Sequence, residues 1–161
     1  MKTLRIAAPA VALLAAFGGR ASAQATATQD VSYEVQAVSQ LSFSGSPSLT
    51  IAAATAGSAP TSVTANATYA VTTNETDRKI TAQIDSDMPS GVGLSVSLAA
   101  PSGGTSAGAV SLSTVAQDVV TGISTLNASG LGVTYSLSAT SAAGVVPAGS
   151  RTVTYTILAG S

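Results

Sequence analysis

From Asp30 onward the chain repeatedly alternates an apolar residue with Ser, Thr or another polar residue. A period of two places successive side chains on opposite faces of an extended strand, so that one face can be buried and the other solvated. The alternating runs are short and are separated by Gly, Pro, Asn and Asp, the residues that tolerate turn geometry. The alternation therefore predicts an all-β protein with antiparallel sheets, each with an apolar inner face and a Ser/Thr-rich outer face.

Seven to nine short strands are expected, mostly 8–15 residues apart. The runs that carry the pattern are residues 31–43, 49–51, 63–71, 78–85, 94–98, 110–112, 119–123, 131–137 and 153–157. For residues 119–123 a helical turn is the alternative. Residues 73–77 predict a hairpin turn, because Asn and Asp hydrogen-bond their own backbone there. This arrangement favours a single antiparallel β-sandwich, immunoglobulin-like or pilin-like.

Residues 1–23 have the three parts of a secretory signal peptide. Lys2 and Arg5 precede an apolar run over residues 6–17, and the small triplet Ala21-Ser22-Ala23 follows. Cleavage there leaves residues 24–161, about the size of one domain, and we expect them to form a single β-sandwich. The protein is therefore predicted to be exported to the periplasm, cell surface or extracellular space. No later apolar stretch is long enough for a spanning helix, so we expect no transmembrane segment after cleavage.

The composition excludes most chemistry. The chain has no Cys and no His, so it lacks disulfides, thiolates, imidazole bases and the principal transition-metal ligands. A Ser–Lys dyad would have to use Lys79, for which we expect a solvated ammonium group. After residue 23 there are three basic and seven acidic residues, which disfavours nucleic acid and anionic lipid as partners. We therefore predict that the protein is not an enzyme and binds no cofactor.

Two carboxylate pairs remain, Glu75 with Asp77 and Asp85 with Asp87. A strand over residues 78–85 would separate them by about 26 Å, too far for one acid–base pair. Each pair could contribute oxygen ligands to Ca²⁺, but neither has the spacing of a known calcium loop. We expect these charges to solubilise turns, and no metal site is predicted.

The aromatic and amide residues give two further expectations. Each tyrosine shares its parity with aliphatic neighbours, which indicates core positions rather than a flat sugar-binding platform; the residues are Tyr33, Tyr69, Tyr135 and Tyr155. All three asparagines lie in Asn-x-Ser/Thr sequons, which are Asn66, Asn74 and Asn127. In a host that glycosylates exported proteins, Asn74 in the predicted turn is the expected acceptor.

Residues 148–157, Ala-Gly-Ser-Arg-Thr-Val-Thr-Tyr-Thr-Ile, place a glycine before alternating β residues and a tyrosine. This segment resembles the last strand of exported bacterial β-sandwich proteins of the spore-coat-U-like and fimbrial pilin-like kind. The resemblance implies a subunit assembled on the cell surface, in many members by donating a strand into the open groove of the next subunit. The chain departs from classical pilins in lacking their paired cysteines, and Tyr155 lies farther from the terminus than a pilin's penultimate tyrosine.

The start of the chain after the signal has the form that a donated strand needs. Residues 24–29 are short and flexible in composition, and alternate side chains then present apolar groups that could fill a groove. The candidate assembly residues are Val31, Tyr33, Val35, Ala37, Leu41 and Phe43. The simpler interpretation, which we favour, is that the same segment is the domain's own first strand.

The predicted function is that of a non-enzymatic structural or assembly protein of the cell surface. It would self-associate, or contact other surface proteins, through edge-strand pairing or strand donation. The alternative is a secreted module that binds carbohydrate or another extracellular ligand with loops at one end of the sandwich, residues 52–60, 100–108 and 142–149.

Overall fold

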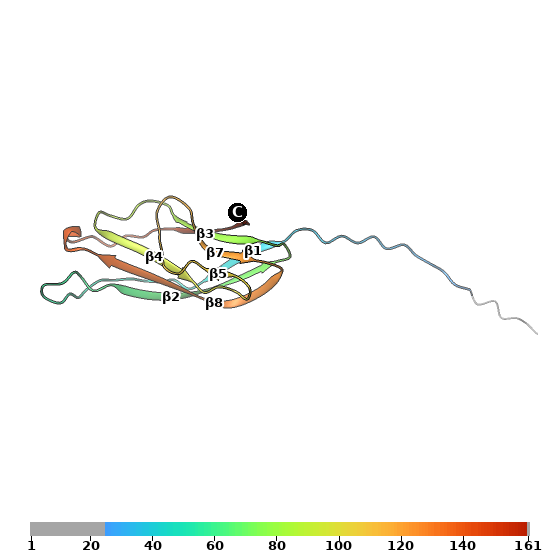
Figure 1. The fold of residues 1–161 in the computed structure, drawn as a ribbon, viewed down its shortest axis with the longest axis horizontal. Helices are drawn as coiled ribbons and strands as arrows, with labels where there is room; N and C mark the ends of the chain where they lie inside the picture. Colours follow the sequence, from blue (N-terminus) through green and yellow to red (C-terminus); the bar gives the residue numbers. More distant parts are fainter. Residues whose placement is uncertain (1–24, 161) are drawn as a thin grey trace, which may run out of the picture. The chain divides into compact units, whose positions relative to one another are not determined.

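The computed structural model describes residues 25–160 (Figure 1), so the predicted signal peptide over residues 1–23 lies outside the described residues. The chain divides into two units, Met1–Glu34 and Val35–Ser161, each described here by itself. The second unit is an all-β sandwich, as the alternation predicts. Its elements are β1 (Ser39–Ser44), β2 (Val63–Thr73), β3 (Arg78–Ile84), β4 (Val92–Leu98), β5 (Thr105–Ser106), β6 (Val110–Ser111), β7 (Gln117–Ile123), β8 (Leu126–Ala139), the 3₁₀ turn η1 (Ser141–Ala143) and β9 (Val153–Ala159).

Two antiparallel sheets form the sandwich. One sheet has the order β1-β2-β8-β4-β6, and the other has the order β5-β7-β3-β9. The core lies between them and contains alternate side chains from both sheets, because each strand has one face toward the other sheet. The most deeply buried large side chains are Tyr69, Val71, Ile80, Ile84, Val96, Leu98, Val119, Val120, Ile123 and Val133.

The turn after β2 differs from its prediction. Residues 73–77 were predicted to form a hairpin, but β2 and β3 belong to different sheets. The chain therefore crosses from one sheet to the other here, and Val71 and Ile80 enter the same core from opposite sides. Asp77 has a φ of 49°, the left-handed conformation that Asp tolerates better than most residues. The prediction of a turn at residues 73–77 was correct, whereas the prediction that its flanking strands pair with each other was wrong.

A bulge interrupts β8. The predicted strand over residues 131–137 lies within β8, which already begins at Leu126. Tyr69 pairs with Leu131 whereas Val71 pairs with Ala128, so β8 holds one extra residue at this point. Gly130 has a φ of 67°, which glycine adopts without steric cost and which such bulges need.

The first predicted strand is shorter than expected. Residues 25–38 form no strand, and β1 starts at Ser39, whose partner Thr73 is the last residue of β2. β2 therefore has no residue left to pair with residues before Ser39. Leu41 and Phe43 are half-buried on the inner face of β1, as predicted. Val31, Tyr33, Val35 and Ala37 are exposed, so the interpretation of residues 31–37 as part of the domain's own first strand is wrong.

Two more predictions can be compared with the fold. Residues 49–51 are not a strand, whereas residues 119–123 lie in β7 rather than in a helical turn. Within the described range, no helix is long and apolar enough to cross a membrane.

Candidate assembly site

Each sheet has two edge strands, and β1 and β9 are the longer edge strand of each sheet. In residues 25–160, β1 pairs only with β2 and β9 pairs only with β3. The two edge strands contact each other across the sandwich, where the ring of Phe43 stacks on that of Tyr155 with 3.9 Å between centroids. An edge strand presents backbone N–H and C=O groups that can pair with a further strand. The sandwich therefore has two sheet edges close together on one side.

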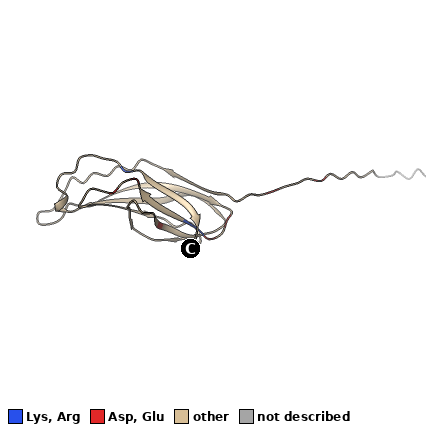
Figure 2. Ribbon diagram, turned by 90° about the horizontal axis from the view of Figure 1, so that it is seen from above, with Lys and Arg blue, Asp and Glu red and all other residues tan. Residues whose placement is uncertain are grey.

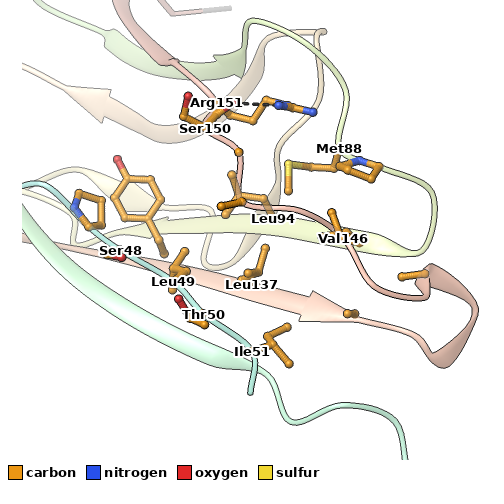
Figure 3. A pocket seen from close by; sticks show the side chains of 18 of the residues that line it. Ser48, Leu49, Thr50, Ile51, Met88, Leu94, Leu137, Val146, Ser150 and Arg151 are labelled. Carbon is orange, nitrogen blue, oxygen red and sulfur yellow. Dashed lines mark hydrogen bonds between the residues drawn. The ribbon is translucent and has the colours of Figure 1, made fainter. Parts of the chain in front are cut away.

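A cavity of about 1230 Å³ adjoins these edges. Its floor is formed by inner-face side chains of β4 and β8, including Leu94 and Leu137, and its walls come from two segments without regular strands, residues 47–54 and 143–151. Figure 3 shows Leu49 and Ile51 on one wall, with Leu94 and Leu137 on the sheet beneath. Leu49, Ile51 and Leu137 are only half-buried. The space is therefore an apolar groove whose side chains are not fully covered.

The groove contains little charge. Charged residues are sparse along the described part of the ribbon (Figure 2), and Arg151 is the one charged residue in the groove lining. Its guanidinium donates two hydrogen bonds to the carbonyl oxygen of Asp87, at 3.2 and 2.9 Å, and one to that of Ser150 at 2.8 Å. These bonds tie the segment before β9 to the turn after β3, which fixes one end of the groove.

Aromatic side chains hold the groove edge in place. Phe43 lies in a stack with both Tyr69 and Tyr155, and the Tyr69 hydroxyl donates to the carbonyl oxygen of Ala99 at 2.6 Å. The hydroxyls of Tyr135 and Tyr155 are 2.8 Å apart and share a hydrogen bond. Burial raises the pKa of Tyr69 to about 12, and burial together with the Tyr135 hydroxyl raises the pKa of Tyr155. The hydroxyls of Tyr69 and Tyr155 therefore stay neutral at physiological pH.

Three of the four tyrosines lie in the core, as predicted. Tyr69 and Tyr135 are buried and Tyr155 is half-buried, whereas Tyr33 is 93% exposed. Tyr33 differs because it precedes the sandwich in the chain. Its prediction as a core residue is wrong, and its exposure leaves a large apolar ring that the described chain does not cover.

The charged residues considered as possible catalytic or metal sites are placed as follows. Lys79 is half-buried and pairs with Asp118 at 3.2 Å, so the prediction of a solvated ammonium is wrong. Asp85 and Asp87 are exposed on the turn after β3. The residues that the structure describes contain no group of three His, Cys, Asp or Glu side chains placed to hold a metal ion.

Glu75 is held in a network where β1 begins. Its carboxylate accepts a hydrogen bond of 2.8 Å from the Ser39 hydroxyl and two from the Arg78 guanidinium, with which it forms an ion pair. The bond from Ser39 and the Arg78 guanidinium hold the pKa of the Glu75 carboxyl below its ordinary value. The network joins the first residue of β1 to the turn between the two sheets.

Glu75→Gln is expected to lower the stability of the sandwich at pH 7. The pKa of the Glu75 carboxyl is lower in the folded protein than in the unfolded chain, where it is about 4.3. The stabilisation from its hydrogen bonds and ion pair is therefore present above pH 5 and disappears as the pH falls through the folded pKa. Urea-denaturation midpoints measured from pH 7 to pH 3 should show wild type and variant converging at the acid end. Glu34→Gln, at an exposed position outside the sandwich, is the control and should match wild type throughout. A gap between Glu75→Gln and wild type that does not narrow as the pH falls below 4 would contradict the assignment.

No protein-family model matches this chain, and no curated protein matches it. The resemblance of residues 148–157 to exported bacterial subunits therefore stays a prediction.

Proposed function

We propose that this protein is a non-enzymatic, exported structural subunit of the cell surface that assembles by strand donation. Residues 30–37 of one copy would enter the open side of the next copy, beside β1 and β9. The observation that carries the proposal is the presence, in one chain, of an exposed alternating segment without a strand partner and an apolar groove flanked by two sheet edges.

The segment has the chemistry of a strand that lacks its sheet. Val31, Tyr33 and Val35 are 77%, 93% and 83% exposed, an unusual state for three large apolar side chains spaced two residues apart. In an added strand all three would point to one face, and the backbone would pair with a sheet edge. Residues 30–37 extended would span about 26 Å, and β9 offers an edge of 7 residues.

The groove has the complementary chemistry. Its lining is predominantly aliphatic over the floor and one wall, and Leu49, Ile51 and Leu137 keep part of their surface in water. Covering one large apolar side chain contributes about 1.5–3 kcal/mol, and backbone pairing with a sheet edge would add to the contribution of the three side chains. The segment carries Asp30 and Glu34 with no basic residue, and the one charged residue of the groove lining is Arg151.

The sequence supports the remaining parts of this proposal. Residues 1–23 have the pattern of an export signal, and the absence of His and Cys removes the usual catalytic groups. Few charges on the surface leave little electrostatic repulsion between copies.

A secreted ligand-binding module is the second candidate, and the same groove is the observation in its favour. A cavity of about 1230 Å³ lined mainly by apolar side chains would suit an apolar molecule. In that case the groove would bind the molecule and residues 30–37 would be dispensable.

The test compares residues 24–161 with a shortened chain, residues 35–161, which keeps the whole compact sandwich unit. Light scattering should show concentration-dependent oligomers for the longer chain and a monomer for the shorter one. A peptide of residues 24–37 should bind the shortened chain and raise its thermal midpoint, whereas a peptide of the same composition with Val31, Tyr33 and Val35 moved to even positions should not. A longer chain that stays monomeric, together with a shortened chain that ignores the peptide, would overturn strand donation and favour the ligand-binding module.

A further inference from the structure

Asn74 holds the residues that join the N-terminal segment to β1. Its side-chain Oδ1 accepts a hydrogen bond of 2.7 Å from the Val38 amide, and its Nδ2 donates one of 2.7 Å to the Gln36 carbonyl oxygen. Its own backbone N–H donates to the Val38 carbonyl oxygen at 3.1 Å. Three hydrogen bonds thus connect this one residue to residues 36–38.

These contacts imitate one more position of a sheet. An Asn side chain carries an acceptor and a donor on one planar amide, as a peptide unit does. β2 has already ended at Thr73, so Asn74 offers residues 36–38 the pairing that the strand no longer supplies. The neighbouring Ser39 hydroxyl, bonded to Thr73 and Glu75, fixes the next residue. Residues 36–39 are therefore held extended as the chain enters β1.

The hydrogen bonds of Asn74 and most of the groove lie toward opposite ends of β1. Asn74 binds the chain at the Ser39 end of β1, whereas the groove begins at Leu41 and continues past the other end of β1 to residues 47–54. For residues 31–35 to enter the groove of their own chain, they would have to reverse direction close to residues 36–38. A reversal there would break the hydrogen bonds to Asn74.

We propose that Asn74 is a positioning residue that prevents the donor segment from folding back into its own groove. The segment thereby stays available to another copy of this chain, and the groove stays open to another copy's segment. This inference rests on the proposed function, since it explains why donation would occur between copies rather than within one.

The experiment uses residues 24–161 with Asn74→Ala or Asn74→Asp, and with Asn127→Ala as the matched control. Asn127 is also an exposed asparagine of a sequon, on β8. Asn74→Asp keeps the acceptor for Val38 but places a carboxylate against the Gln36 carbonyl. Asn74→Ala removes both side-chain hydrogen bonds and should accelerate hydrogen exchange of the Val38 amide by about tenfold, whereas Asn127→Ala should leave it unchanged.

Light scattering and binding of the peptide of residues 24–37 then report on assembly. The Asn74 variants should give a several-fold larger monomer fraction than wild type at equal concentration. These monomers should bind the peptide several-fold more weakly, because their own segment occupies the groove. In residues 35–161, which lack the segment, Asn74→Ala should leave peptide binding unchanged, which separates the effect from damage to the groove.

Failure of the role proposed for Asn74 can be distinguished from failure of strand donation itself. If the shortened chain with Asn74 intact binds no peptide, strand donation itself fails, and this inference fails with it. If that chain binds the peptide but Asn74→Ala assembles as wild type does, the positioning role of Asn74 is overturned alone. Unchanged exchange at Val38 would also overturn it.

Discussion

Tyr33→Asp is expected to abolish assembly of residues 24–161 while leaving the stability of the sandwich unchanged. Tyr33 is the largest and, at 93%, the most exposed of the apolar side chains in the segment. Donation would bury it in an aliphatic groove, so the variant loses about 1.5–3 kcal/mol of apolar burial. It must also place a carboxylate in a groove whose one charged lining residue, Arg151, is already hydrogen-bonded to the carbonyl oxygens of Asp87 and Ser150, which costs further free energy. The apparent association constant should fall by at least about a hundredfold.

Ser32→Asp provides the matched control, because it adds the same charge one position earlier. Residue 32 has the opposite parity and would face away from the groove in a donated strand. Its assembly should weaken by no more than a few-fold, as measured by light scattering across a concentration series. Equal losses for Tyr33→Asp and Ser32→Asp would mean that net charge, and not insertion of alternate side chains, governs association.

Tyr69→Ala should cause the largest loss of stability of any single truncation in the described core, about 3–5 kcal/mol. Tyr69 is 2% exposed, stacks on Phe43 with 5.5 Å between ring centroids, and donates its hydroxyl to the Ala99 carbonyl. Removing the ring leaves a void between the two sheets and removes support from the groove edge. Urea-induced unfolding followed by circular dichroism would measure the free energy of unfolding of the variant.

Tyr69→Phe separates the two contributions of this residue. It keeps the ring and the stack but removes the hydrogen bond to Ala99, so the expected loss is about 1 kcal/mol. A loss for Tyr69→Ala no larger than that for Tyr69→Phe would show that the stack on Phe43 contributes nothing to the cooperative core.

The inward faces of the sandwich could be predicted from the sequence. In β3, Ile80, Ala82 and Ile84 are buried as their parity predicts, and the same holds for Leu94, Val96 and Leu98 in β4. Period two determines which side chains share a face because the geometry of a single strand requires it. These predictions needed no knowledge of which strands pair.

Pairing between strands was not predictable in the same way. The turn after Thr73 has the residues of a hairpin, yet it connects two sheets, because both flanking strands bury apolar faces and either arrangement satisfies the pattern. Residues 31–37 alternate as well as β3 does, but Ser39 already pairs with Thr73, the last residue of β2, so β2 has no residue left to pair with them. Strand formation depends on a partner elsewhere in the chain, and the local sequence does not contain that information.

The groove was missed for a related reason. Two of its wall residues, Leu49 and Ile51, lie on a segment predicted as a short strand, and Val146 lies in a segment predicted as a loop. One feature of the sequence could have indicated the groove. Its wall segments contain apolar residues, but the Gly, Pro and Ser around them make a regular strand unfavourable. The exposed position of residues 31–37 could not be inferred, since their pattern fits a buried strand equally well.

The edge strands β1 and β9 lie on a single side of the sandwich, and in the proposed assembly each chain would contribute one donor segment and one groove. Contacts made in this way would join unlike surfaces, so the interface would be heterologous and would extend into an open polymer unless the rotation between copies closed a ring. The product would be an unbranched polymer with a direction, in which one terminal subunit keeps an empty groove and the other an unused segment. Its length would then be governed by subunit supply and by whatever molecule caps either end, rather than by the geometry of the subunit.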